Sequence, residues 1–198
     1  MDDARITNSY GVFEAYLARR RAAVADRLIP SALREGRLLD IGCGWTPLFL
    51  LQTVFREKVG VDAEVKRWGV SSGITLLTLD VEEAGTLPFP DGHFDVVTML
   101  AVFEHIRSEK LPGVLREIRR VLTARGRLIL TTPCPWTDPV LRVLACAQLV
   151  SPEGVHEHQA TYTPRIIIRH LQAAGFDPSK IRFGYFEAGF NTWLYADR

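Results

Sequence analysis

Three aspartates in the first half of the chain, Asp40, Asp62 and Asp80, each lie within or directly after a short apolar stretch. If these stretches are parallel strands, the three carboxylates meet at one edge of a sheet, where ligands of such folds bind. A carboxylate accepts hydrogen bonds from both hydroxyls of a ribose, which suits Asp62, and from an exocyclic amine such as that of adenine, which suits Asp80. The spacing therefore predicts a nucleoside-shaped slot.

A glycine turn follows the first of these aspartates, in Leu38–Gly44 (LLDIGCG). Gly42 and Gly44 allow the backbone to approach a ligand closely. We expect Thr46 to cap the next helix and Pro47 to be its first residue. The dinucleotide fingerprint Gly-x-Gly-x-x-Gly fails because Pro47 occupies the third glycine position, and the chain has no Gly-x-x-x-x-Gly-Lys-Ser/Thr loop.

Histidines are the candidate general bases, because imidazole titrates near neutral pH. His105 follows the apolar run Phe94–Leu100 closely enough to face a ligand at the sheet edge, although capping a helix is an equally good reading. His156 and His158 would lie in a loop, where either could accept a proton. Their spacing suits one side of a strand, but no third metal ligand is identifiable, so we expect no metal site.

Composition narrows the class of protein. The 198 residues carry a net charge of +1, which predicts one domain (1–198) with no general attraction to nucleic acid. No apolar stretch is long enough to span a membrane. Three cysteines without metal-ligand spacing favour a reducing, cytoplasmic setting, and Cys43 is expected to be a buried, unreactive thiol. The run Arg19–Arg21 is expected to be a solvated helix face.

Apolar stretches alternate with helical patterns along the chain. Strands are expected at Arg37–Ile41, Lys58–Val61, Ile74–Leu79, Phe94–Leu100, Leu128–Thr131, Ile181–Phe186 and Thr192–Tyr195. Helices are expected at Tyr10–Ile29, Pro47–Phe55, Leu111–Leu122, Leu141–Val150 and Thr163–Gly175. The alternation predicts an α/β fold: a doubly wound, Rossmann-like, seven-stranded and mostly parallel sheet, its last strand antiparallel, with helices on both faces.

The ordered set of motifs resembles the class I S-adenosylmethionine-dependent methyltransferases, within their small-molecule group (methyltransferase type 11-like). The likeness covers most of the chain. It is carried by residues 38–44 (LLDIGCG), 59–62 (VGVD), 80–81 (DV), 87–92 (LPFPDG), 94–106 (FDVVTMLAVFEHI), 116–133 (REIRRVLTARGRLILTTP), 162–164 (YTP) and 173–176 (AAGF). One position departs from the pattern, because Thr46 stands where the family often has a third glycine.

The resemblance implies S-adenosylmethionine as the cofactor and methyl transfer to a small molecule as the reaction. It implies a cofactor site made of Asp40, Gly42, Cys43, Gly44, Asp62, Asp80, Val81 and Leu100. Asp40, the Gly42 backbone and the Leu100 carbonyl would bind the methionine amino group. Asp62 would hold the ribose hydroxyls, Asp80 the adenine amine, and the Val81 amide an adenine ring nitrogen.

The acceptor is less constrained by the sequence. The leading helix (1–30) and the segment 133–162 are expected to cover the site as helix and substrate cap, with Tyr10, Phe13, Tyr16 and Trp136 favouring an apolar or aromatic acceptor. A hydroxyl acceptor would need a base, whereas a carboxylate or neutral amine would not.

Two functions of other classes compete with this interpretation, and a third is another kind of methyltransferase. A catalytically silent cofactor-binding or regulatory protein would agree with Thr46 in the glycine turn. A nicotinamide-dependent oxidoreductase is disfavoured by Pro47 and by the Asp80–Val81 pair. A nucleic-acid methyltransferase is disfavoured by the near-neutral charge and by the absence of an Asn-Pro-Pro-Tyr motif after the fourth strand.

Overall fold

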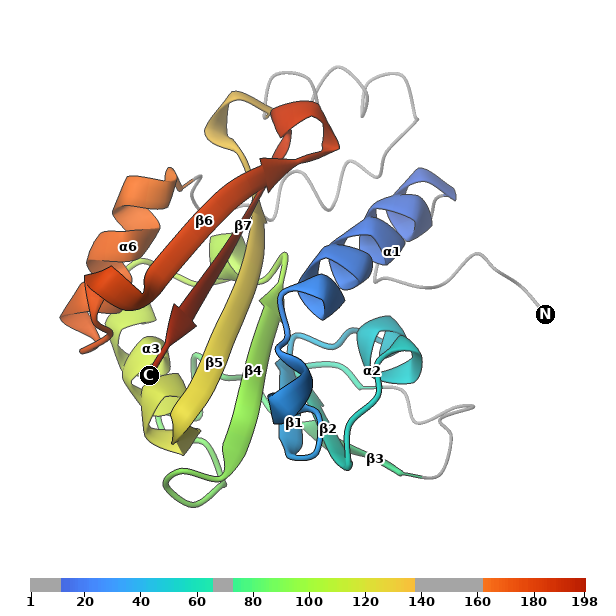
Figure 1. Cartoon of the computed structure of the whole chain (residues 1–198), viewed down its shortest axis with the longest axis vertical. Helices are drawn as coiled ribbons and strands as arrows, with labels where there is room; N and C mark the ends of the chain where they lie inside the picture. The colour runs from blue at the N-terminus through green and yellow to red at the C-terminus, as the bar shows by residue number, and fades with distance from the viewer. Residues whose placement is uncertain (1–11, 66–72, 138–161) are drawn as a thin grey trace.

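The computed structural model describes residues 12–65, 73–137 and 162–198, and in these residues a seven-stranded sheet has the order β3-β2-β1-β4-β5-β7-β6 (Figure 1). The strands are β1 (Arg37–Ile41), β2 (Glu57–Asp62), β3 (Ile74–Thr78), β4 (Phe94–Leu100), β5 (Leu122–Pro133), β6 (Ile181–Phe186) and β7 (Asn191–Asp197). The first five strands are parallel, and β7 runs antiparallel to both β5 and β6. The predicted doubly wound sheet with an antiparallel last strand is confirmed.

Helices cover both faces of this sheet, because successive strand residues point to opposite sides. The helices are α1 (Val12–Arg27), α2 (Leu48–Gln52), α3 (Leu111–Val121) and α6 (Pro164–Ala173). Leu38 of β1 belongs to a buried cluster with Ala22 of α1 and Phe49 of α2. The next residue, Leu39, belongs to a second cluster with Leu115 of α3 and Ile167 of α6. Figure 1 shows the same division, with α1 and α2 on one side of the strands and α3 and α6 on the other.

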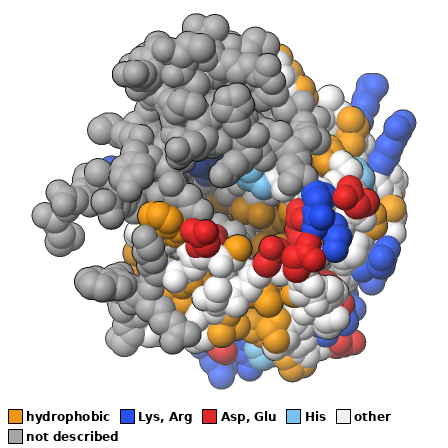
Figure 2. Space-filling model, turned by 180° about the vertical axis from the view of Figure 1, so that it is seen from behind, with side chains coloured by type: hydrophobic (Ala, Val, Ile, Leu, Met, Phe, Trp, Pro, Cys, Tyr) orange, Lys and Arg blue, Asp and Glu red, His pale blue; other side chains and the backbone are white. Residues whose placement is uncertain are grey.

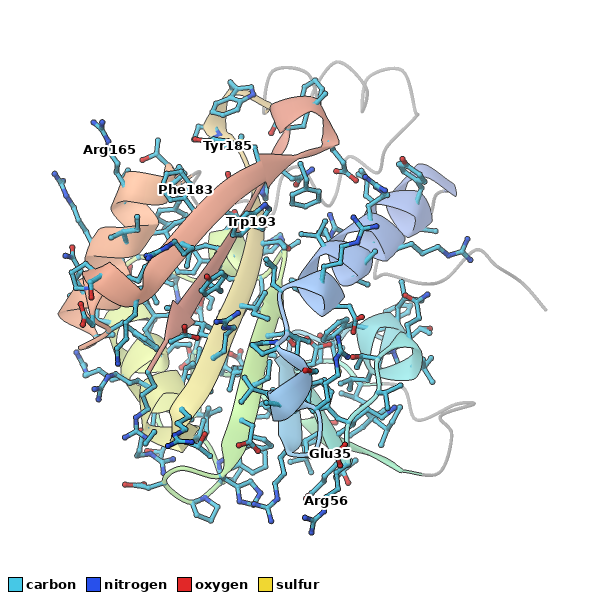
Figure 3. The ribbon with its side chains drawn as sticks, in the orientation of Figure 1. Glu35, Arg56, Arg165, Phe183, Tyr185 and Trp193 are labelled. Carbon is cyan, nitrogen blue, oxygen red and sulfur yellow. The ribbon has the colours of Figure 1, made fainter. Side chains whose placement is uncertain are left out.

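The strand order reverses between β1 and β4, so the switch point of the sheet lies at their carboxyl ends. In Figure 3, Glu35 and Arg56, which precede β1 and β2, mark the lower, amino edge of the sheet. Tyr185, near the end of β6, marks the upper, carboxyl edge. This upper edge is where the sequence places its candidate site.

The start of α2 differs from the expectation. The helix begins at Leu48 and Pro47 occupies the N-cap position, so Thr46 is not the cap and Pro47 is not the first helical residue. Pro47 has φ −74° and ψ 66°, and the Leu48 amide donates to the Thr46 carbonyl at 2.7 Å. These values describe an inverse γ-turn, which the fixed φ of proline favours. The turn delays the helix, which ends at Gln52 rather than Phe55.

The junction of α3 and β5 also differs. The expected strand Leu128–Thr131 is the middle of a longer strand that starts at Leu122, so Gly126 lies inside β5 instead of beyond the helix end. Phe94 pairs with Leu122 and Val96 with Arg127, which places a bulge in β5 between these pairs. Leu122 kept the helical spacing because it is buried in the same cluster as α3.

Some expectations fall outside the described residues: the helix Leu141–Val150, Cys146, and most of the segment 133–162. The two described cysteines, Cys43 and Cys134, are free and buried. Within the described part of the chain, no helix combines the length and the apolar character that crossing a membrane requires.

Candidate cofactor site

Asp40 is a buried carboxylate near the carboxyl end of β1. The residue is 3% exposed, and its side chain accepts a hydrogen bond at 2.6 Å from the Thr98 hydroxyl on the neighbouring strand β4. Burial raises the pKa of Asp40 to about 7, the Thr98 hydrogen bond opposes this rise, and the nearby Asp62 charge adds to it. A cationic group placed beside Asp40 would therefore gain a strong, dry ion pair.

Asp62 ends β2 and organises the backbone around the site. Its Oδ2 accepts from the Gly44 amide at 2.8 Å and its Oδ1 accepts from the Glu64 amide at 2.9 Å. Each oxygen of a carboxylate has a second lone pair, so Asp62 keeps the capacity to accept from two ribose hydroxyls. The structure thus adds a backbone-holding role to the binding role that the sequence predicted for Asp62.

The turn after β1 needs glycine at its first position for two reasons. Gly42 has φ +71°, a left-handed conformation that residues with a Cβ rarely adopt. A Cβ at Gly42 would also lie 2.2 Å from Cγ2 of Val102. Gly44 has φ +73°, and a Cβ there would approach only the Thr46 carbonyl oxygen, at 4.0 Å. The bare backbone predicted for this turn is therefore present, with Val102 packed against it.

Cys43 lies between the two glycines and is buried, as expected. Burial, with the charges of Asp40 and Asp62, raises the pKa of this thiol well above its usual range. Its sulfur lies against β2, since a Cβ added at Gly60 would be 2.8 Å from Sγ. A thiol held protonated in this way is not a nucleophile, so Cys43 contributes backbone and packing to the turn.

Asp80 and Val81 follow β3 at the same edge of the sheet. Asp80 is exposed, and its Oδ1 accepts from the Glu82 amide at 2.9 Å. Its carbonyl oxygen accepts from the Ala84 amide at 3.0 Å, so the residues after β3 form a turn capped by the Asp80 side chain. Val81 is half-buried and packs against the cluster beneath α3. The pair is available to a planar base at the rim of the sheet.

The end of β4 has a strained backbone. Ala101, directly after Leu100, has φ +58°, and its amide donates to the Thr131 carbonyl of β5 at 2.9 Å. Left-handed conformations of non-glycine residues concentrate at functional sites. Leu100 is half-buried and packs on the α1 side of the sheet.

Of the three candidate bases, one lies in the described chain. His105 closes the short 3-10 helix η2 (Phe103–His105), and its amide donates to the Val102 carbonyl at 3.0 Å. His105 is half-buried and follows β4 in the chain, and β4 lies on the side of β1 opposite to β2. His156 and His158 lie outside the described residues. No group of three His, Cys, Asp or Glu side chains that could hold a metal ion occurs within the described ranges.

The leading helix α1 lies close to the turn between β6 and β7. Arg20 of α1 lies 4.0 Å from Glu187, the first residue of the turn η5 (Glu187–Gly189) between β6 and β7. Burial raises the pKa of Glu187, and the charges of Arg21 and Arg20 oppose that rise. Arg19 and Arg20 are exposed and Arg21 is half-buried, so the expected solvated helix face is present, and its charges also act on Glu187.

Aromatic side chains gather beside this turn. Trp136 is 53% exposed, and its ring centroid lies 5.9 Å from that of Tyr185 on β6. Figure 3 shows Tyr185 and Phe183 on β6 with Trp193 on the neighbouring β7. From behind, Figure 2 shows a hollow beside the undescribed residues, with hydrophobic side chains at its floor and acidic side chains on its sides.

Three features of the site were not found in the sequence: Thr98 as the partner of Asp40, Val102 as the side chain against Gly42, and a bond network between Glu82 and Arg107. Thr98 left a signal, because it is the one hydroxyl in the apolar run Phe94–Leu100. The other contacts join residues far apart in sequence, and spacing alone does not reveal them.

These residues fit the cofactor that the sequence suggested. S-adenosylmethionine carries a sulfonium and an ammonium, and the two carboxylates Asp40 and Asp62 lie on adjacent strands around a turn of bare backbone. Within the described residues Asp40 forms no ion pair, so a cationic ligand is the group that its buried carboxylate lacks.

Comparison with known proteins agrees with this fit. The family model of a methyltransferase domain matches residues 13–180. A 33% identical relative, the uncharacterized methyltransferase YcgJ of Bacillus subtilis, aligns over 54% of this chain and 44% of its own length. The demethylmenaquinone methyltransferase of Symbiobacterium thermophilum is 35% identical over 46% of this chain and 40% of its own. The ubiquinone biosynthesis O-methyltransferase of Aeromonas salmonicida is 28% identical over 70% of this chain and 62% of its own.

The chain thus spans less than two thirds of each of these relatives. Among solved structures, an S-adenosylmethionine-dependent methyltransferase from Archaeoglobus fulgidus has a TM-score of 0.67 at 17% identity, covering 93% of this chain and 94% of its own. One from Mesorhizobium loti has a TM-score of 0.66 at 17% identity, covering 92% and 100%. At 17% identity, these similarities establish a shared fold and do not establish a shared function. From the family match and the site that fits its cofactor, this chain belongs to the class I S-adenosylmethionine-dependent methyltransferases.

Proposed function

We propose that this protein transfers a methyl group from S-adenosylmethionine to a hydroxyl of a small apolar or aromatic molecule. The observation that carries the proposal is the pair of carboxylates, Asp40 and Asp62, that flank the turn at Gly42 and Gly44. When bound, the cofactor supplies a methyl group already activated on a sulfonium. The protein then has to hold the acceptor oxygen within about 3–3.5 Å of that methyl group and exclude water.

Each residue of the site has a proposed role. Asp40 and the Leu100 carbonyl hold the amino group of the methionine part, and Asp62 accepts from the ribose hydroxyls. Asp80 accepts from the adenine amine and the Val81 amide donates to an adenine ring nitrogen. The positions of these residues, all at the carboxyl ends of β1 to β4, support these assignments.

The proposal for the acceptor rests on three observations. His105 lies just after β4, where an acceptor beside the switch point would meet it, and we assign it the removal of the hydroxyl proton. Two relatives bear the names demethylmenaquinone methyltransferase and ubiquinone biosynthesis O-methyltransferase, which favours a quinone-like, aromatic acceptor here. The exposed rings of Tyr16 and Trp136 support an apolar or aromatic acceptor for this chain too.

Thermal unfolding with S-adenosylhomocysteine, and with NADH as the control, tests the cofactor. Ligand at a hundred times its dissociation constant adds roughly 2.7 kcal/mol to the free energy of unfolding, which raises Tm by roughly 5–10 °C for a chain of this size. A rise with NADH alone would favour an oxidoreductase instead.

Turnover tests the acceptor. The protein is incubated with S-adenosylmethionine and a panel of catechols, hydroquinones and charged non-aromatic hydroxy acids, and S-adenosylhomocysteine is measured. We expect product with the aromatic hydroxyls and a large loss in His105→Ala. Product with only the charged acids would refute the aromatic acceptor, and cofactor binding without any product would favour a silent binding protein.

A further inference from the structure

A network of hydrogen bonds joins the turn after β3 to the segment after β4. The Glu82 carboxylate accepts from the Arg107 amide at 2.6 Å through Oε1 and from the Arg107 Nε at 2.7 Å through Oε2. The Arg107 guanidinium also donates to Glu83, and the Lys110 ammonium donates to the Glu82 carbonyl at 3.4 Å. We name the bonds between Glu82 and Arg107 the clasp.

The clasp links parts of the sheet that are not neighbours. In the strand order, β2 and β1 lie between β3 and β4. Three strand spacings separate β3 from β4, which is about 14 Å. The clasp therefore joins segments that follow β3 and β4, the strands on either side of β1 and β2, which carry Asp40 and Asp62.

Glu82 also belongs to the turn that presents Asp80. The Glu82 amide donates to Asp80 Oδ1 at 2.9 Å, and the Glu83 amide donates to the same oxygen at 3.4 Å. One carboxylate oxygen of Asp80 is thus fixed by the backbone that the clasp holds. The other oxygen has no bond among the described residues of the turn, and Val81 lies between Asp80 and Glu82 in the chain.

We propose that Arg107 and Glu82 are positioning residues that set Asp80 and the Val81 amide in the geometry that distinguishes adenine from other bases. This inference rests on the proposed cofactor roles of Asp80 and Val81. A carboxylate beside a backbone amide matches the amine and the ring nitrogen of adenine. The same pair meets a carbonyl and an N–H in hypoxanthine, where both hydrogen bonds are lost.

The geometry separates this role from a role in stability alone. The Arg107 side chain is 38% exposed, and ion pairs at such sites contribute little to the free energy of unfolding. The Glu82 side chain is only 15% exposed and uses both of its oxygens in the clasp. Glu83 binds the same guanidinium but is 61% exposed, which makes it the matched control.

The test compares the dissociation constants of S-adenosylhomocysteine and of its inosine analogue, S-inosylhomocysteine, measured by calorimetry. We expect Glu82→Ala and Arg107→Ala to bind S-adenosylhomocysteine about tenfold more weakly. We also expect the preference for adenosine over inosine to fall, since a misplaced Asp80 no longer discriminates. Glu83→Ala should keep the affinity and the preference of the parent protein.

The outcomes are distinguishable. A parent protein that prefers the adenosine ligand, with Glu82→Ala showing the same preference, overturns the clasp and leaves the cofactor site intact. A parent protein that binds neither ligand overturns the cofactor roles and the clasp with them. Glu82→Gln, which keeps an acceptor for the Arg107 amide, should recover part of the affinity, and it replaces Glu82→Ala if that variant does not fold.

Discussion

Thr98 Oγ1 lies 2.6 Å from Asp40 Oδ1, so a hydroxyl of β4 donates to the buried carboxylate of β1. The same hydroxyl is 3.4 Å from the Leu39 carbonyl oxygen. Asp40 and Thr98 are also register partners in the parallel pairing of the two strands. The central polar contact of the site is therefore built into the sheet itself and does not depend on a loop.

Replacing Thr98 by valine removes this donor and keeps the shape of the side chain. Asp40 then has no hydroxyl to stabilise its charge, so its pKa rises further and the free energy of unfolding at pH 8 falls by about 1–3 kcal/mol. Urea unfolding of Thr98→Val measures the change. Thr131→Val is the control on the adjacent strand, because the buried Thr131 hydroxyl has no partner in the described structure. Equal losses in both variants would contradict the special role of Thr98.

The pH dependence of stability follows from the raised pKa of Asp40. The unfolded chain releases this proton near pH 4, whereas the folded protein keeps it up to about pH 7. The unfolded state therefore binds fewer protons between these values, and the stability falls as pH rises through this window, by about 4 kcal/mol in total. Asp40→Asn removes the cost of burying a charged carboxylate, so we expect this variant to be more stable than the parent at pH 8 and equal to it near pH 4. Unfolding by urea at both pH values checks this, and a variant less stable at pH 8 would contradict the assignment.

The affinity for the cofactor should rise with pH up to about pH 7, whereas the stability of the protein falls over the same range. The ligand's ammonium pairs with the charged form of Asp40, so below pH 7 a proton must leave before the pair forms. The affinity for S-adenosylhomocysteine should then fall by up to about tenfold for each pH unit below 7. Calorimetry in buffers of different ionisation enthalpy would detect the released proton. Asp40→Asn should bind weakly at every pH, and a pH-dependent affinity in that variant would place the titrating group elsewhere.

Gly42→Ala should destabilise the protein in two ways, through the left-handed backbone and through a clash with Val102. Gly85→Ala measures the first effect alone. Gly85 also has positive φ (+64°), but a Cβ there meets nothing within 4 Å, so Gly85→Ala should lower the free energy of unfolding by about 1 kcal/mol. Gly42→Ala adds the clash with Val102 and should cost about 1–3 kcal/mol more, with loss of cofactor binding. Denaturant midpoints of both variants test this. Adding Val102→Ala to Gly42→Ala should recover part of the loss, and no recovery would place the strain elsewhere.

The sheet could be predicted from the sequence because its signals are local. Phe94–Leu100 is a continuous apolar run between turn residues, and the structure makes it a central strand. The pair Thr163 and Pro164 marks the start of α6, and Gly175, at φ +94°, follows its end. In each case the type of residue and its neighbours decide the structure.

The parts that could not be predicted depend on contacts between distant residues. Pro47 looked like a first helical residue, but the hydrogen bond across it makes an inverse γ-turn. Leu122 fits the helical spacing of the sequence because its side chain enters the same core as α3, although its backbone belongs to β5. The Asp62 bond to Gly44 and the clasp join residues 18 and 25 positions apart, where spacing carries no information.

Asp62 holds the amides of Gly44 and Glu64 through hydrogen bonds within the protein itself. These bonds shape the turn that would receive the cofactor, so we expect binding there to remove little conformational entropy from the backbone. The affinity of this turn for the cofactor then depends on how well its shape and charges match those of the cofactor. An enzyme with such a preorganised end can change the residues around its acceptor without loss of affinity for the methyl donor, so one sheet can serve different acceptors.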